Sequence, residues 1–457
     1  MIFLFEKYRS WSLIIISSLL YVYFGYFLER TDFYTLLILW VSLFICYVFL
    51  LREKPYSFSK WVGIFILFRM VLLMAIPNLS QDFYRFIWDG RLLFEGLNPY
   101  LTNPKDFINN SVTVIAQSKE LIEGMGSLSA GNYTNYPPLH QAAFWLAAVF
   151  GQDSILDSVI VMRILIVLAD IGILFIGRKL LALVKLPKDL IFWYLLNPFI
   201  ILEYTGNLHF ESLMLFFLLT SIYLLFLNKW IWSSLVMACA ISVKLIPLLF
   251  IPLLFTWFVK EPLHRKKGLL GLSKLLAYSI LVLMVNAVLF APFYSFTMLQ
   301  NYSESIGLWL GVFEFNASFY YLFREIGYWF RGYNEIAIIS KIISTLSFVF
   351  ILMISFFRKN DSPKRLLTAF LFAISFYYFM STTVHPWYIG TLVLLAIFTK
   401  YRFPFVWSFV LVFSYASYGA NTFHENPWWL LLEYVLVYGT LSYEIFIKKS
   451  KSDQLTT

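Results

Sequence analysis

Charged residues are scarce in this sequence. Lys, Arg, Asp and Glu make up 13% of the 457 residues, whereas soluble globular domains carry about 25%. Hydrophobic residues account for 60%, and the mean hydropathy is +0.74. The chain has too few polar groups to cover a water-exposed surface. A soluble protein is therefore excluded, and a polytopic membrane protein is predicted.

Cysteine is nearly absent as well. Cys46 and Cys239 both lie inside apolar stretches, which excludes a disulfide framework and a cysteine-based metal site. The sequence lacks a glycine-rich phosphate loop, a Walker motif and a nucleophile elbow, and it has no spacing typical of metal ligands. We therefore expect neither a metal nor a cofactor. No internal repeat is evident, which disfavours a transporter built from two similar halves.

The net charge of +9 does not indicate a nucleic-acid partner, because the basic residues lie in short turns between apolar segments. Basic turns of this kind face the cytoplasm. We therefore expect both termini to be cytoplasmic, with an uncleaved first span. The basic positions are Arg52, Lys54, Lys60, Arg178, Lys179, Lys185, Lys188, Lys229, Lys260, Arg265, Lys266, Lys267, Arg358, Lys359, Lys364, Arg365, Lys400, Arg402, Lys448, Lys449 and Lys451.

The apolar segments predict an all-α membrane protein with about 12–14 transmembrane or re-entrant helices. We expect one domain over 1–457, with two spans in 1–60. A large external loop over 78–156 would carry juxtamembrane helices, and 292–334 would form a second, amphipathic external loop. The remaining spans are expected near 61–77, 190–205, 210–227, 268–291, 335–357, 366–384, 388–399, 403–420 and 428–447.

Two apolar segments do not fit the pattern of helices that cross the membrane once. Residues 136–150 are too short to span, and Pro137 and Pro138 suit the first turn of a helix, so a juxtamembrane helix is predicted. The segment 230–259 has basic residues at both flanks, which favours a re-entrant hairpin. Pro247 would break its backbone hydrogen bonds near Lys244.

The external loop opens with Asp82, Arg85 and Asp89 among aromatic residues. If this stretch is helical, Asp82 and Asp89 share a face. A carboxylate at the mouth of a span could deprotonate an acceptor hydroxyl. The alternative is a solvated cluster in which Asp82 pairs with Arg85.

Other candidates lie elsewhere on the expected outer side. Lys244, at the tip of the hairpin, either binds an anionic headgroup such as a phosphate or extends to the membrane surface. Single histidines in two outer turns, His209 and His385, either contact substrate or are structural. Arg324 and Arg331 could hold a lipid phosphate or face headgroups. Arg163 either forms a structural ion pair with Asp157 or binds a phosphate.

Four short blocks together resemble the GT-C superfamily of integral-membrane glycosyltransferases. The resemblance is to the polyprenyl-phosphate-mannose-dependent mannosyltransferases of bacteria and, more distantly, to the enzyme adding the first mannose to glycosylphosphatidylinositol. The blocks occur in order over about two-thirds of the chain. They are Asp82–Phe86 with Gly96–Tyr100, Asn135–Leu139 including Tyr136, Lys244–Pro247, and His385–Tyr388.

This resemblance implies a GT-C-like fold and an inverting transfer of a hexose, mannose in this family. The donor would be a polyprenyl-phosphate sugar, and the acceptor a lipid or glycan at the outer face. Asp82 would be the catalytic base, supported by Asp89, Arg85, Tyr136 and His209. The donor phosphate would be bound by Lys244, Arg324, Arg331 and His385.

The sequence departs from the family in two ways. Some members have an adjacent acidic pair, whereas the carboxylate that follows Asp82 is Asp89. The family's catalytic loop often follows the first span, and here it follows the third.

The subgroup that the chain resembles implies a location in the bacterial inner membrane. Two other functions stay open: a lipid-linked glycan polymerase or ligase, and a lipid-linked sugar transporter.

Overall fold

The computed structural model describes residues 2–52, 56–107, 115–259, 268–311, 313–418 and 423–447. Within these ranges the chain forms helices joined by loops and contains no β-strand. The β-type pairing in these ranges consists of two isolated bridges, Phe315 with Thr383 and Tyr418 with Phe423. The predicted all-α class is confirmed.

Five helices of the described ranges are long and apolar enough to cross a membrane. They are Phe33–Arg52 (α2), Ile155–Leu183 (α7), Gly268–Phe293 (α13 with a short extension), Ile336–Phe357 (α16) and Pro427–Ile447 (α20 with a short extension). Pro198–Gly206 and Glu211–Phe226 (α10) make a sixth if counted as one span bent by 113°. The chain is thus a multi-pass membrane protein.

Several predicted spans are short or broken rather than continuous. The segment 388–399 contains only α18 (Gly390–Ala396), and 403–420 contains α19 (Phe403–Val410) followed by a 3₁₀ turn. Pro198 and Pro404 lie in the first turns of their helices. Proline fits a first turn but cannot continue a preceding helix, which explains why new helices begin at these positions.

The other helices are shorter or less apolar than these spans. They are α1 (Ile2–Tyr26), α3 (Phe58–Met70), α4 (Asp82–Phe94), α5 (Ser118–Ala130), α6 (Pro138–Gly151), α8 (Phe192–Leu195), α9 (Pro198–Ile200), α11 (Trp230–Val243), α12 (Phe255–Val259), α14 (Phe296–Gly311), α15 (Phe319–Arg331) and α17 (Pro363–Phe379).

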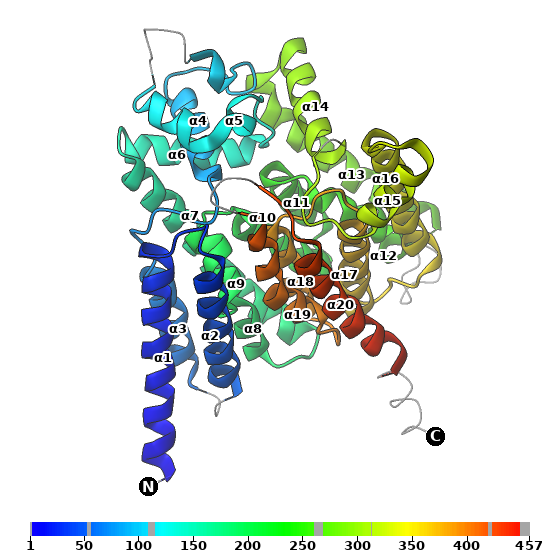
Figure 1. The fold of residues 1–457 in the computed structure, drawn as a ribbon. Helices are drawn as coiled ribbons and strands as arrows, with labels where there is room; N and C mark the ends of the chain where they lie inside the picture. Colours follow the sequence, from blue (N-terminus) through cyan, green and yellow to red (C-terminus); the bar gives the residue numbers. More distant parts are fainter. Residues whose placement is uncertain are drawn as a thin grey trace.

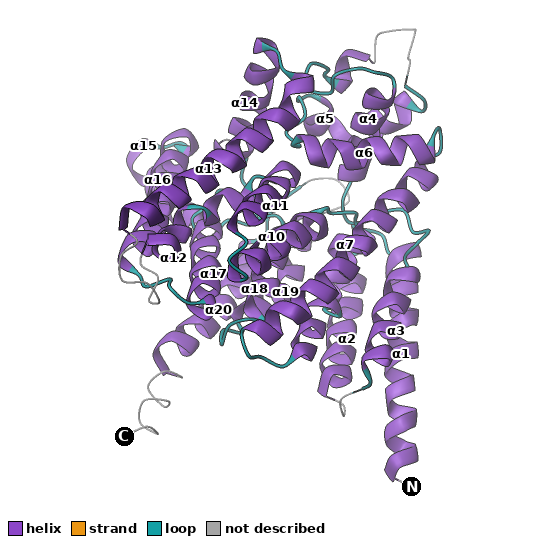
Figure 2. Cartoon of the chain, turned by 180° about the vertical axis from the view of Figure 1, so that it is seen from behind, coloured by secondary structure: helices purple, strands orange, loops and turns teal. Residues whose placement is uncertain are grey.

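Helices α4, α5, α6 and α14 gather at one end of the molecule. In both views, α4, α5, α6 and α14 lie together at the top, and α1 begins at the opposite end (Figures 1 and 2). The last described segment, Tyr443–Ile447, also points toward that opposite end (Figure 1). Part of the basic pattern behind the predicted orientation lies outside the described residues: Lys54, Lys260, Arg265, Lys266, Lys267, Lys448, Lys449 and Lys451.

Three local predictions are confirmed. Pro138 occupies the first turn of α6. α11 ends at Val243, and Lys244 has extended backbone angles of φ −148° and ψ 143°. α15 is amphipathic, since Leu322, Ile326, Trp329 and Phe330 recur at helical spacing and are all exposed. Its position at the membrane interface stays a prediction.

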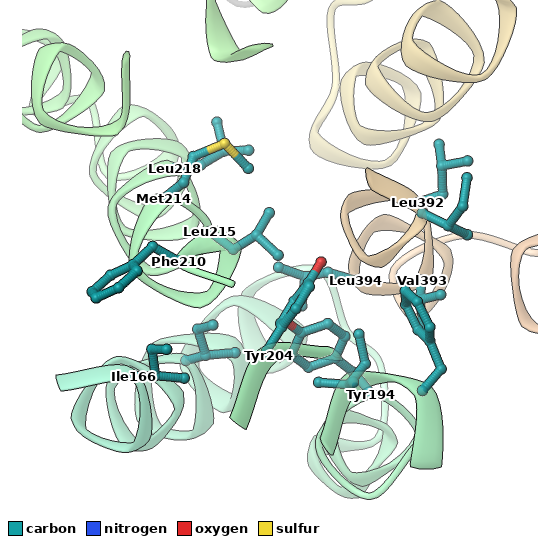
Figure 3. Packing of buried hydrophobic residues seen from close by; sticks show 14 of the residues in the cluster. Ile166, Tyr194, Tyr204, Phe210, Met214, Leu215, Leu218, Leu392, Val393 and Leu394 are labelled. Atoms are coloured by element: carbon teal, nitrogen blue, oxygen red, sulfur yellow. The ribbon is translucent and has the colours of Figure 1, made fainter. Parts of the chain in front are cut away.

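A continuous apolar core packs several helices together. Side chains of α7, α8, α10 and α18 converge around Tyr204, including Ile166, Tyr194 and Leu215 (Figure 3). The Tyr204 hydroxyl donates a hydrogen bond to the Trp387 carbonyl at 3.0 Å. A side chain at Gly390 would overlap that hydroxyl, at 1.7 Å from an added Cβ. Glycine at position 390 therefore lets Tyr204 hold the segment carrying Trp387.

Candidate active site

Asp82 is the first residue of α4, and the segment before it is fixed by the neighbouring turns. The Leu79 amide donates to Asn207 Oδ1 at 3.2 Å. The Asn78 side-chain amide donates to two carbonyls at the end of α1 and just beyond it, those of Phe24 and Leu28. These bonds place the start of α4 beside the turn that carries His209.

Lys244 forms a buried ion pair with Glu211. Its Nζ donates to Glu211 Oε1, and the two side chains are 18% and 3% exposed. Glu211 is the first residue of α10, and Lys244 follows the last residue of α11. Glu211 Oε2 is buried without a hydrogen-bond partner in the described part of the chain. The end of α11 at Val243 thus places Lys244 beside the start of α10.

A stack of three rings adjoins this pair. His209 and Trp387 lie face to face with ring centroids 3.7 Å apart, and His385 covers the other face of Trp387 at 4.5 Å. Because both faces of the indole are occupied, Trp387 holds the two imidazoles in place and cannot stack on a sugar. Burial lowers the pKa of His385 to about 3, and the charge of Lys244 adds to the effect. His385 is therefore neutral at neutral pH.

Asp82 is the carboxylate at the centre of these charges. Burial raises its pKa to about 6; the positive charges of Lys244 and Arg30 oppose the rise, and Glu211 adds to it. The guanidinium of Arg30 lies 3.3 Å above the ring of Tyr418, and its Nε is buried without a hydrogen-bond partner among the described residues. Asp82 thus lies within electrostatic reach of two cations from distant parts of the chain.

Arg85 and Asp89 lie behind Asp82 and pair with each other. Arg85 Nε is 2.7 Å from Asp89 Oδ1, and Gln141 of α6 donates to Asp89 Oδ2 at 2.9 Å. Arg85 also donates to the carbonyls of Ser129 and Asn132. In place of the alternative Asp82–Arg85 pair, Arg85 thus forms an i,i+4 pair with Asp89, and these contacts tie α4 to α5 and α6.

The close contact of α4 with α6 depends on Gly90. A Cβ at this position would lie 2.2 Å from the Phe144 carbonyl oxygen. Beside this contact, Tyr136 accepts a hydrogen bond at its carbonyl from the Tyr100 hydroxyl, at 2.7 Å. Burial raises the pKa of the Tyr136 hydroxyl, and the charge of Asp82 contributes, which places this phenol near the carboxylate.

The remaining predicted residues lie apart from this cluster. Arg324 pairs with Glu314 at 3.1 Å, and Arg331 pairs with Glu335 at 3.6 Å on the exposed end of α15. No contact in the described ranges joins either arginine to Asp82 or Lys244. Their predicted phosphate-binding role thus has no structural support here.

Arg163 forms neither a pair with Asp157 nor an open phosphate site. Its buried guanidinium donates to four backbone carbonyls, at 2.7–2.9 Å. Two belong to the segment before Asp82 and two to the turn before His209; they are those of Leu73, Ala75, Thr205 and Gly206. Arg163 therefore links the two segments that carry the site.

Comparison with known proteins identifies the family of this chain. The sequence model of the alpha-(1->6)-mannopyranosyltransferase N-terminal domain matches residues 16–260. The chain belongs to this family. The matched region contains Asp82, Tyr136, His209 and Lys244 and stops before His385.

Two relatives carry the same family name. The chain is 20% identical over 221 residues to alpha-(1->6)-mannopyranosyltransferase A of Mycobacterium tuberculosis, which covers 48% of this chain and 41% of the relative. It is 23% identical over 167 residues to alpha-(1->6)-mannopyranosyltransferase B of Corynebacterium glutamicum, covering 36% and 25%. The chain thus matches less than half the length of either mannopyranosyltransferase.

Sequence reasoning missed four members of the cluster. The sequence assigns no role to Glu211 or to Arg30. Trp387 lay inside a recognised block, but its packing between two histidines has no sequence signature. His140, packed among Phe86, Tyr136, Phe144 and Phe210, lies in an apolar helix with nothing in the sequence to distinguish it.

Proposed function

We propose that this protein transfers mannose from a polyprenyl-phosphate donor to a lipid or glycan acceptor at the outer face of the bacterial inner membrane. Both termini would lie in the cytoplasm. The observation that carries the proposal is the position of Asp82, a carboxylate with a raised pKa beside Lys244 and Arg30. Membership of the mannopyranosyltransferase family supports mannose as the sugar.

In the proposed reaction, Asp82 accepts the proton of the acceptor hydroxyl as its oxygen attacks the anomeric carbon. The bond between that carbon and the phosphate oxygen breaks, and polyprenyl phosphate leaves with the electron pair. Attack from the face opposite the phosphate inverts the anomeric centre. The transition state resembles an oxocarbenium ion, as in glycoside hydrolysis.

The leaving phosphate needs positive charge, and two cations of the cluster supply it. Lys244 has three N–H donors, of which Glu211 takes one. Arg30 has a buried Nε without a partner among the described residues. A phosphate oxygen would satisfy these donors, so we assign Arg30, beside Lys244, as the second phosphate-binding residue.

The donor is tested with purified protein in lipid vesicles that also contain a lipid-linked mannoside acceptor. We expect radiolabel to pass to the acceptor from polyprenyl-phosphate mannose and not from GDP-mannose. Label passing from the nucleotide sugar would contradict the proposed donor. Movement of the lipid-linked sugar across the bilayer without a new glycosidic bond would instead support the transporter interpretation.

The pH dependence follows from the pKa of Asp82. A base must be deprotonated to act, so kcat/KM should fall about tenfold per pH unit below about pH 6 and level off above it. Lys244 lowers the pKa of Asp82, and Lys244→Gln should therefore move this midpoint to higher pH and raise KM for the donor. The matched control is Lys119→Gln, at an exposed lysine of α5. If the pH midpoint of kcat/KM were the same in Lys244→Gln as in wild type, Lys244 would not act on the pKa of Asp82.

A further inference from the structure

A second cavity lies on the side of α4 turned away from Asp82. Its volume is about 230 Å³, and it is bounded by α4, the segment before α5 and the connection between α6 and α7. Arg91, which lines it, is nine residues after Asp82. Nine residues turn a helix by about 900° and advance it by about 13 Å, so Arg91 and Asp82 lie on opposite faces. The cavity is therefore separate from the candidate active site.

Arg91 is the buried polar group of this cavity. The residue is 4% exposed, and its two terminal nitrogens donate to the Ala116 carbonyl and to Gln117 Oε1. Its Nε is buried without a partner in the described part of the chain. An unsatisfied donor on a charged group costs free energy, and an oxygen atom of a ligand in the cavity would satisfy it.

The other lining groups favour a neutral, hydroxyl-rich ligand. Glu95 and Asp153 also line the cavity, so its formal charge is one positive and two negative, which disfavours a phosphate or carboxylate ligand. Carboxylates, a guanidinium and the amide of Gln152 supply the acceptors and donors that sugar hydroxyls require. Phe94, which is 53% exposed, adds an apolar face for the C–H groups of a sugar ring.

Two strained backbone positions lie beside this cavity. Gln117 and Gln152 both have positive φ angles, of 51° and 44°. Few non-glycine residues adopt such angles, and the strain persists only where surrounding contacts enforce it. One glutamine contacts Arg91 and the other lines the cavity. The chain thus holds two amide side chains at this cavity at a conformational cost.

We propose that this cavity is a second carbohydrate site, which binds a neutral glycan. Its role as a holding site for the acceptor chain rests on the proposed function. A glycan bound there would keep a multi-sugar acceptor on the external end of the protein while its terminal hydroxyl reaches Asp82.

The test uses a variant that removes lining groups without straining the fold. In Gln152→Gly/Asp153→Ala, glycine replaces a residue at positive φ, so the free energy of unfolding should not fall. The matched control is Lys185→Gly, an exposed residue at φ 57° beyond the other end of α7. Binding of neutral alpha-(1->6)-linked mannotriose to the full-length protein in nanodiscs is measured by calorimetry, without donor.

We expect wild type and Lys185→Gly to bind the trisaccharide equally, and the double variant to bind it about fivefold to tenfold more weakly. Equal binding by all three proteins, or no binding by wild type, would overturn the proposal, as would displacement of the trisaccharide by inorganic phosphate. The titration needs no turnover. A protein that binds the glycan but transfers no mannose would therefore refute the proposed function and leave this inference standing.

The acceptor role has its own readout. With a lipid-linked acceptor of several sugars, the double variant should raise KM about fivefold to tenfold and leave kcat unchanged, because Asp82 is untouched. With a single-sugar acceptor, too short to reach the cavity, KM should equal that of wild type. If the double variant had the same KM as wild type for the multi-sugar acceptor as well as for the single-sugar acceptor, the holding role would be overturned.

Discussion

Asp82→Asn is expected to reduce mannosyl transfer by about 10²-fold to 10⁴-fold, the usual contribution of a general base. The amide has the shape of the carboxylate but cannot take the acceptor proton. The fold should survive, because a carboxylate in the first turn of a helix contributes only about 0.3–1 kcal/mol through the helix dipole. The measurement is transfer from radiolabelled polyprenyl-phosphate mannose, beside thermal unfolding of the same preparation.

Glu123→Gln is the matched control for this experiment. Glu123 lies in α5 of the same external segment, is 68% exposed, and pairs only loosely with Lys119 at 4.0 Å. Its neutralisation should leave transfer unchanged. If Asp82→Asn kept wild-type turnover, the base would have to be another carboxylate. Glu211 would be the first alternative, because its Oε2 has no partner in the described ranges, whereas Arg85 and Gln141 engage both carboxylate oxygens of Asp89.

The helical class and several breaks were predictable because they depend on local chemistry. Composition alone predicted a multi-pass membrane protein. Pro138 marked the start of α6, and Pro247 marked the interruption beside Lys244. The broken spans were harder to predict. Their sequences are mostly apolar, and hydropathy does not distinguish one continuous helix from two short ones that meet at a bend.

The partners within the site could not be predicted, because they are set by tertiary packing. Lys244 and Glu211 are 33 residues apart, and each could have faced many other groups. The sequence left Arg324 and Arg331 open as phosphate ligands or as headgroup-facing charges, and it did not indicate that Glu314 and Glu335 pair with them. Arg30 lies in a short polar turn between two spans, where nothing indicates its approach to Asp82.

The partners of Arg163 could not be predicted either, because the sequence does not indicate which backbone carbonyls accept hydrogen bonds from a side chain. The sequence left open a pair with Asp157 or a phosphate contact, yet the guanidinium joins the segment before Asp82 to the turn before His209 through four carbonyls. The planar five-donor guanidinium suits this arrangement, whereas lysine offers only three donors from one point. Arg163 is thus a positioning residue, which acts on the site through the backbone.

Arg163→Met is therefore expected to lower the free energy of unfolding by about 3 kcal/mol or more, since buried carbonyls would lose their donor. The melting temperature in detergent should fall on the order of 5 °C. Below that temperature kcat should also fall, because the start of α4 and the His209 turn would no longer be held together. The pH midpoint set by Asp82 should be retained in Arg163→Lys, which keeps the charge.

Arg178→Met is the control on the same helix. Arg178 pairs with Asp189 at 2.5 Å, but the side chains are 21% and 53% exposed, and exposed pairs contribute about 0–1 kcal/mol. Its melting temperature should stay near that of wild type. Equal melting temperatures and equal kcat for Arg163→Met and Arg178→Met would mean that the four carbonyls find other donors. The position of Asp82 beside Lys244 would then depend on the contacts of α4 with α5 and α6.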